Sequence, residues 1–301
     1  MFFYLKWIDR RPIIPIITQQ KPSNLNFSSQ FKIGKKEFTI CGQINEKFTE
    51  YYPDKKIYYS KYQYLQSHLQ KCIRRMDSIK SVKTAKHLID INIVSFLRRL
   101  PIIMLEDVTI HESISIIIWL MIAVSKGYKI RYDMIKWLLG VVYHLSNDIN
   151  KTIYNNKNIP VVEINMEHPN KNILYSLFFR KAFGGMNGDM NMIQYYINTI
   201  QENNIIIQKD KIPLIKICME PLDKKEWIYQ ANDFHCNKYI LKNIHKIHTK
   251  FSEDYIKMLI WYFSSSFNQR VSLINYPVKD RENWDKIKKT VKKVQKSCIY
   301  Y

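Results

Sequence analysis

The chain contains a few groups of side chains that could carry acid–base or metal chemistry. Asp233, His235 and Cys236 form one group, and His245 and His248 follow it, three residues apart. An aspartate and a histidine can exchange a proton, and histidine and cysteine are the side chains that bind zinc. Residues two positions apart diverge on a helix, however, and no nucleophile stands beside the pair. We therefore predict no catalytic centre and no metal site here.

A pair of adjacent carboxylates, Glu106 and Asp107, follows an apolar run and could bind Mg²⁺. Arg98 and Arg99 lie close before them in the sequence, so ion pairs with these arginines are the simpler interpretation, together with a favourable charge at the start of the next helix. The sequence motifs of nucleotide-binding loops, zinc proteases and serine hydrolases are absent. We predict no cofactor.

A cluster of three glycines lies at positions 184–188, directly after Arg180 and Lys181. Backbone N–H groups ahead of a helix can hold a phosphate, with the two cations as partners. A connection between two helices that needs positive φ angles explains the same glycines. Because Asp189 already occupies the start of the next helix, we favour the second interpretation.

Basic side chains are grouped along predicted helices. We expect Lys71 and Arg74 to project from the polar side of their helix, where they could contact phosphates without reading a base sequence. For the lysines near the C-terminal end, a solvated helix face is an equally good explanation. The candidate nucleic-acid-binding residues are Lys71, Arg74, Arg75, Arg98, Arg99, Arg180, Lys181, Lys288, Lys289, Lys292 and Lys293.

The overall charge also indicates an anionic partner. The formal net charge is +21, from 47 lysines and arginines against 26 aspartates and glutamates. A surface this basic attracts polyanions, and nucleic acid is the commonest polyanion inside a cell. The abundance of Ile, Lys, Asn and Tyr also fits AT-rich codons, which raise the lysine content without selection for binding. Codon bias alone does not lower the acid content, so we favour an anionic partner.

Cysteine usage and hydropathy indicate the compartment. The five cysteines are scattered, odd in number and never spaced as CxxC, which is typical of free thiols in a reducing compartment. The first residues lack the basic-then-apolar order of a signal peptide. The most apolar stretch, residues 114–124, has about half of the ~20 residues that a membrane-spanning helix needs. We expect an intracellular protein of the cytoplasm, the nucleus or a viral factory, with no membrane partner.

Hydrophobic periodicity predicts a mainly α protein with a helical bundle or hairpin architecture. Alternating apolar residues on either side of positions 34–36 predict a β-hairpin within a small N-terminal β-containing extension. Asp77 is expected to cap the second helix. A third segment is expected at 93–105, with a kink or restart at Pro101. The capping box 109–112 is expected to open the apolar helix at 114–124. The expected organisation is an extension at 1–58, a helical domain at 59–150, a linker at 151–172 and a second helical region at 173–301 that ends in a basic helix.

Two short blocks in the helical domain resemble a known family. They are Ser67-x-Leu69-Gln70-Lys71-x-Ile73-Arg74 with Asp77 and Ala85 after it, and Arg98-Arg99-Leu100 followed by Glu106-Asp107-Val108. In this order they are similar to the C-terminal helical region of RarA/MgsA-type clamp-loader-like AAA+ proteins, over residues 60–125. The resemblance implies a helical module that forms oligomers or contacts DNA near replication forks. The chain has no ATPase module, so the ATP-driven activity of that family is not carried over.

Taken together, these features predict a non-enzymatic nucleic-acid-binding accessory protein in replication, repair or genome packaging, with sequence-independent binding. Two other classes stay open. One is a structural or assembly protein whose apolar faces bind protein partners or a second copy of the chain. The other is an enzyme with a centre assembled from distant positions, using Asp233, His235, Glu106 or Asp107.

Overall fold

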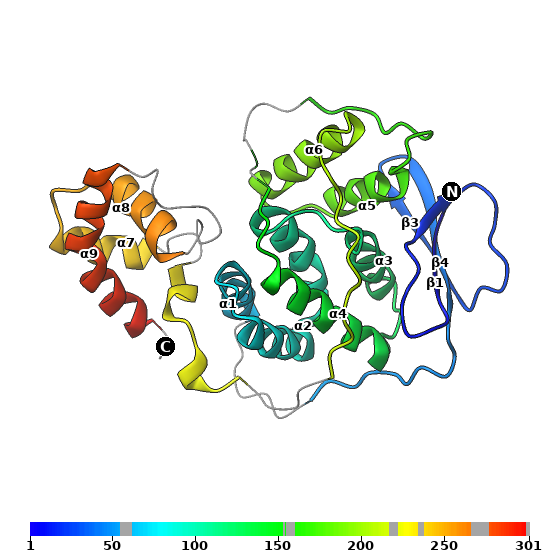
Figure 1. Cartoon of the computed structure of the whole chain (residues 1–301), viewed down its shortest axis with the longest axis horizontal. Helices are drawn as coiled ribbons and strands as arrows, with labels where there is room; N and C mark the ends of the chain where they lie inside the picture. Colours follow the sequence, from blue (N-terminus) through cyan, green and yellow to red (C-terminus); the bar gives the residue numbers. More distant parts are fainter. Residues whose placement is uncertain are drawn as a thin grey trace.

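The computed structural model contains a small sheet at one end, a group of helices in the middle and further helices at the other end (Figure 1). The strands are β1 (Phe2–Trp7), β2 (Ile16–Thr18), β3 (Phe27–Ile33) and β4 (Lys36–Ile44). The α-helices are α1 (Tyr62–Arg74), α2 (Ser78–Asp107), α3 (Ile114–Ser125), α4 (Tyr132–Asn147), α5 (Lys171–Ala182), α6 (Asn187–Gln201), α7 (Lys238–Ile247), α8 (Glu253–Leu259) and α9 (Val278–Ser297). Short 3₁₀ turns are η1 (Lys224–Glu226) and η2 (Tyr229–Asp233), and η3 (Ile260–Ser264) is a π-helical turn.

The prediction of a mainly α protein is confirmed, since helices far outweigh strands. No helix in the described part of the chain is both long enough and apolar enough to cross a bilayer. The described cysteines, Cys41, Cys72 and Cys298, are free thiols. The structure describes residues 1–54, 62–152, 154, 160–216, 222–233, 238–265 and 277–298.

The N-terminal strands form a mixed sheet with the order β2-β1-β4-β3. The predicted hairpin is confirmed, because β3 and β4 pair antiparallel up to Ile33 opposite Lys36, with Gly34 at positive φ in the turn. β1 pairs parallel to β4. Trp119 of α3 fixes the sheet to the helices, because its indole N–H lies 3.1 Å from the carbonyl oxygens of both Phe3 and Cys41.

Two separate hydrophobic cores organise the described part of the chain. The larger core runs from Phe3 to Ile212, and it includes both the sheet and helices α1–α6. It continues across residues 151–172, because buried side chains on both sides of that segment pack together. We call α1–α6 the helical body. The smaller core joins Ile244 of α7, Leu259 of α8 and Ile287 of α9. We call residues 238–265 and 277–298 the C-terminal unit.

The start of α2 and the position of its break both agree with the sequence analysis. The prediction that Asp77 caps this helix is confirmed, because its carboxylate accepts a hydrogen bond from the Lys80 N–H at 3.1 Å. The helix breaks at Asn92, with φ −158° and ψ 85°, directly before the predicted third segment at 93–105, so that boundary is confirmed. The additional kink or restart expected at Pro101 is wrong, because the backbone stays helical there. The Asn92 side chain accepts a hydrogen bond from the Ser95 N–H at 2.9 Å and so caps the continuing helix.

The predicted capping box before α3 is also wrong. Ser113 is the residue before the helix, and its side chain makes no capping hydrogen bond. Thr109 lies too far upstream to cap α3, and its hydroxyl lies 2.8 Å from that of Thr152. The apolar helix itself is present at Ile114–Ser125, and its burial explains why it forms without a capping side chain.

Gly140 of α4 lies close to the backbone of the segment that follows α6. The chain after α6 crosses over α4, as Figure 1 shows, and the Ile215 N–H donates to Lys136 O at 3.3 Å. A Cβ atom on Gly140 would overlap the carbonyl group of Pro213, which is backbone and has no side-chain freedom to move aside.

We therefore expect Gly140→Ala to lower the free energy of unfolding by about 1–3 kcal/mol, the usual cost of overpacking. Gly188→Ala is the matched control, because a Cβ there meets nothing within 4 Å. On helix α6 that change should be neutral or slightly stabilising. Urea unfolding of both variants measures the difference, and equal stabilities would contradict the described approach of the two segments.

Candidate functional site

Arg74, in the last turn of α1, holds two carboxylates at the end of α2. Its Nε atom donates to Asp107 Oδ1 at 2.5 Å, and its Nη2 atom donates to Glu106 Oε1 at 2.8 Å. The Arg74 side chain is 5% exposed and the Asp107 side chain is fully buried. Burial raises the pKa of the Asp107 carboxyl, and the adjacent Arg74 guanidinium opposes that rise. Buried charges need close partners of opposite sign, so each of these side chains depends on the others.

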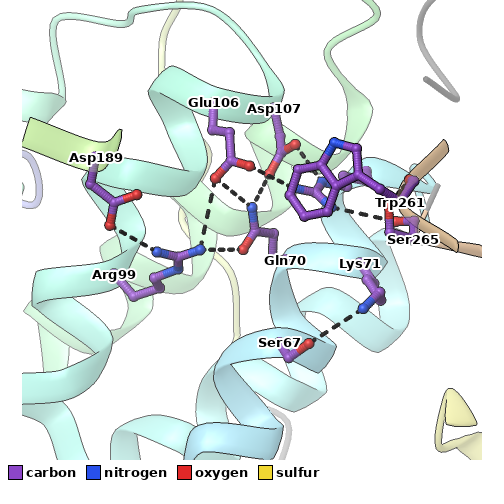
Figure 2. A network of polar contacts seen from close by, with 10 residues as sticks. Ser67, Gln70, Lys71, Arg99, Glu106, Asp107, Asp189, Trp261 and Ser265 are labelled. Carbon is purple, nitrogen blue, oxygen red and sulfur yellow. Dashed lines mark hydrogen bonds and ion pairs between the residues drawn. The ribbon is translucent and has the colours of Figure 1, made fainter. Parts of the chain in front are cut away.

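Gln70 connects this pair to a second arginine (Figure 2). Its amide nitrogen donates to Glu106 at 2.8 Å and to Asp107 at 2.7 Å, while its oxygen accepts from Arg99 Nη2 at 2.6 Å. Arg99 in turn pairs with Asp189 at 3.2 Å and with Glu106 at 3.7 Å. The predicted pairing of the 106–107 carboxylates with the arginines is thus confirmed for Arg99. Gln70 could have been placed beside Arg74 from its spacing of one helical turn.

The same arginine also contacts the C-terminal unit. Arg74 Nη1 donates to Ser265 O at 3.5 Å, and its guanidinium lies 5.4 Å from the centre of the Trp261 ring. Arg75 donates to Ser264 O at 3.3 Å. Carbonyls at the end of a helical turn lack partners within it, and guanidinium groups satisfy them. No local sequence signal indicates Ser265 or Trp261, because the Arg74–Ser265 contact spans 191 residues.

Several predicted phosphate-binding cations are buried, which corrects their expected exposure. The exposed fractions are 2% for Lys71, 5% for Arg74, 9% for Arg99 and 3% for Arg180. The Lys71 ammonium lies 3.5 Å from the hydroxyl of Ser67, which is itself buried. The prediction that Lys71 and Arg74 project into solvent is wrong, because α1 is covered by α2, by α4 and by η2. Arg74 and Arg99 are neutralised by carboxylates inside the protein.

The cations around the glycine cluster hold the connection between α5 and α6. Arg98 Nη2 donates to Phe183 O at 2.9 Å, and Arg180 Nη1 donates to Gly184 O at the same distance. Gly184 has a φ of +74°, so the interpretation as a helix–helix connection is confirmed. Burial lowers the pKa of Arg180 to about 10, and the nearby Arg98 adds to this effect. Lys181 donates to the side chain of Gln194 at 2.6 Å.

The lysines of α9 are exposed, in contrast to the buried cations of the helical body. Between residues 286 and 296 the chain has six lysines and no acidic residue. Ile287 and Val291 bury the opposite side of this helix in the smaller core. Tyr229 packs under two of the lysines, with its ring centre 5.8 Å and 5.7 Å from their ammonium groups. We call the exposed set the lysine face, and it consists of Lys286, Lys288, Lys289, Lys292, Lys293 and Lys296.

Comparisons with models of known protein families, with curated proteins and with solved structures find no match to this chain.

The candidate metal-binding histidines that the structure describes have separate structural partners. His245 Nδ1 lies 2.9 Å from Phe251 O, and His248 Nε2 lies 2.8 Å from the Thr290 hydroxyl. His235, Cys236 and the side chain of Asp233 lie outside the described residues. Among the side chains that are described, no three of His, Cys, Asp and Glu lie close enough together to hold a metal ion.

A histidine and a cysteine meet inside the helical body, in protonation states that disfavour nucleophilic chemistry. His68 Nδ1 lies 2.9 Å from the Thr84 hydroxyl and 3.5 Å from Cys72 Sγ. Burial raises the pKa of the Cys72 thiol to about 12 and lowers the pKa of His68 to about 3. A reactive cysteine needs a thiolate beside a protonated base, whereas here both groups are held neutral. They form part of the packing between α1 and α2.

Removing one of the two carboxylate partners of Arg74 should destabilise the fold. Asp107→Ala removes the fully buried one of the two carboxylates that pair with Arg74 and leaves Glu106 alone to compensate the guanidinium. We expect a loss of about 3 kcal/mol in the free energy of unfolding, the lower end of the cost of breaking a buried ion pair. Asp285→Ala is the control, because its ion pair with Lys288 is largely exposed and should contribute at most about 1 kcal/mol. Chemical denaturation measures both. Similar losses in the two variants would contradict the proposed burial of the Arg74 network.

Buried histidines should make stability depend on pH below neutrality. Burial lowers the pKa of His111 to about 4 in the folded protein, and the hydrogen bond to the Asp210 carbonyl opposes this shift only in part. Between the unfolded pKa of about 6.5 and this value, the unfolded chain binds a proton that the folded chain excludes, so stability falls as the pH falls. Between pH 7 and about pH 5, the free energy of unfolding of His111→Gln should therefore fall by about 2 kcal/mol less than that of the wild type. Urea titrations at the two pH values test this, and identical pH dependence of variant and wild type would exclude it.

Proposed function

We propose that this protein is a non-enzymatic nucleic-acid-binding accessory protein that contacts the phosphate backbone with the lysine face of α9. The observation that carries the proposal is the run of six lysines without an acidic residue between positions 286 and 296, all exposed on a helix whose other side is buried. Phosphate contacts require positioned positive charge and little else, so such a face favours binding that does not depend on sequence.

The spacing of the lysines suits a polyanion. Lys288, Lys292 and Lys296 follow one another at intervals of one helical turn, which places their Cα atoms ~6 Å apart along the helix axis. Lys289 and Lys293 form a second row beside them. Asp285 pairs with Lys288 at 2.7 Å and marks the N-terminal limit of the acid-free stretch. A chain of phosphates can neutralise several of these charges at once and release counterions.

The proposal assigns a different role to the buried cations. Arg74 and Arg99 already have carboxylate partners, so binding a phosphate would require breaking those pairs. We infer that they position the helical body and the C-terminal unit, and that exposed lysines supply the affinity. The resemblance of residues 60–125 to the helical region of clamp-loader-like proteins supports placing this activity in replication, repair or genome packaging. An enzyme centre at Glu106 and Asp107 is less favoured, because both carboxylates are engaged by Arg74.

The proposal predicts salt-dependent binding of mixed-sequence DNA or RNA. We expect Lys289→Gln combined with Lys293→Gln to weaken binding to every sequence alike. On duplex DNA, the slope of log K against log salt concentration should become less steep by about 0.9 for each phosphate that the variant no longer neutralises. Fluorescence anisotropy over a series of salt concentrations measures both quantities.

Lys126→Gln combined with Lys129→Gln is the matched control, because it removes the same charge from exposed positions beyond α3, on the helical body. It should leave the slope almost unchanged. Absence of binding at low salt, binding that does not respond to salt, or equal effects of the two double variants would contradict the proposal.

A further inference from the structure

A cavity of about 770 Å³ lies beside the start of β4, where α5 and α6 and the segment 161–166 surround it. Figure 1 shows α5 and α6 next to each other, with the sheet beyond α5. The volume falls in the range of about 300–1,000 Å³ that is usual for small-molecule sites. Val161 lines the rim and is 78% exposed, so the cavity is accessible from solvent. It is far along the chain from the lysine face and takes no part in the function proposed above.

Apolar side chains form most of the cavity wall. Phe38 and Ile197 line it and are themselves almost fully buried, so their outer surfaces are the floor of the cavity. Tyr175, Phe178 and Ala182 of α5 contribute the side. A surface of this kind favours the burial of a hydrocarbon or aromatic group over contact with water.

A partly buried cation lies beside this apolar wall. Lys181 lines the cavity, and its ammonium donates to Gln194 Oε1 at 2.6 Å. The amide nitrogen of Gln194 donates to Asn198 Oδ1 at 2.7 Å. An ammonium group has three donors, so two of them remain for another partner. Burial lowers the pKa of the Lys181 amine, and among the described residues no carboxylate lies within ion-pair distance of it.

The surroundings of Lys181 differ from those of two buried arginines of the helical body. Arg74 and Arg99 are each matched by carboxylates at hydrogen-bond distance. Lys181 has a neutral amide instead. Two acids also line the cavity, but Glu37 is paired with Lys32 at 3.0 Å and Glu163 is exposed. Lys36 adds a second positive charge to the lining. The site therefore offers an apolar volume with an uncompensated positive charge at its wall.

We infer that this cavity binds an amphipathic anion, namely a hydrocarbon chain that carries a single carboxylate. The chain would lie against Phe38, Phe178 and Ile197, and the carboxylate would take the two remaining donors of Lys181. Lys36 is exposed, so Lys181 is the one lining cation that is partly buried beside the apolar wall. One partly buried ammonium matches a single negative charge, which favours a carboxylate over a polyphosphate. This site is independent of nucleic-acid binding, because it shares no residue with the lysine face.

Calorimetric titration of the full chain with dodecanoate and with dodecanol, near neutral pH, tests the inference. We expect dodecanoate to bind with one-to-one stoichiometry and dodecanol to bind at least roughly tenfold more weakly, because the alcohol has no charge to pair with the Lys181 ammonium. Lys181→Met keeps the apolar stem and removes the charge, so it should weaken dodecanoate to the level of the alcohol. Ile197→Trp should fill the floor of the cavity and weaken both ligands.

Lys171→Met is the matched control, because Lys171 lies on the same helix but outside the cavity lining. It should bind dodecanoate as the wild type does. Failure of the wild type to bind dodecanoate, equal binding of acid and alcohol, or equal effects of the Lys181 and Lys171 substitutions would overturn the inference. The comparison of acid with alcohol uses the wild-type chain, so its outcome does not depend on whether a variant folds.

Discussion

The compensation of one buried charge, that of Arg74, constrains how the parts of this protein fit together. Its guanidinium faces Asp107 and Glu106 at the end of α2 on one side and the carbonyl of Ser265, just after η3, on the other. A guanidinium taken out of water is tolerated only where all of these acceptors are in place. The end of α1, the end of α2 and the C-terminal unit must therefore adopt a single arrangement. Gln70 extends this constraint to Arg99 and to α6.

The positive charges of the molecule fall into two groups, which are buried cations with internal partners and exposed cations. Cations that point toward the junction are neutralised by acids and by backbone carbonyls, and they serve the architecture. The lysines on α9 are exposed to solvent, because Ile287 and Val291 bury the opposite side of that helix in the smaller core. A net charge of +21 is therefore not a measure of available charge. Only the outward-facing part can interact with a polyanion.

Local sequence patterns predicted features that depend on neighbouring residues. The hairpin around Gly34 and the cap at Asp77 are determined by residues within a few positions, and both were predictable. The burial of Lys71 was not, because hydrophobic periodicity reports a single apolar stripe, whereas α1 is covered on several sides. The break of α2 at Asn92 coincides with the predicted start of the third segment, because Asn92 leaves the helical conformation and caps the segment after it. The kink expected at Pro101 is absent, because the helix continues through this residue.

The candidate site, too, could be predicted from the sequence only in part. The attraction between the 106–107 carboxylates and nearby arginines could be foreseen from their proximity in sequence, but the choice of Arg99 over Arg98 could not. Arg98 instead reaches a carbonyl 85 residues away. The cavity beside Lys181 combines residues from β4, α5 and α6 with those of a loop, so only the folded chain brings them together.

The smaller core has a dynamic consequence. Few apolar side chains hold α7, α8 and α9 together, and Arg74 and Arg75 of the helical body reach this unit through polar contacts. Segments with little buried apolar surface open at a lower free energy than the rest of a protein. Backbone amides of these three helices should therefore exchange with solvent before those of α3 and α4, while the larger core stays closed. A polyanion that binds only the closed form would slow this exchange through mass action, and it would do so without touching the interior of the protein.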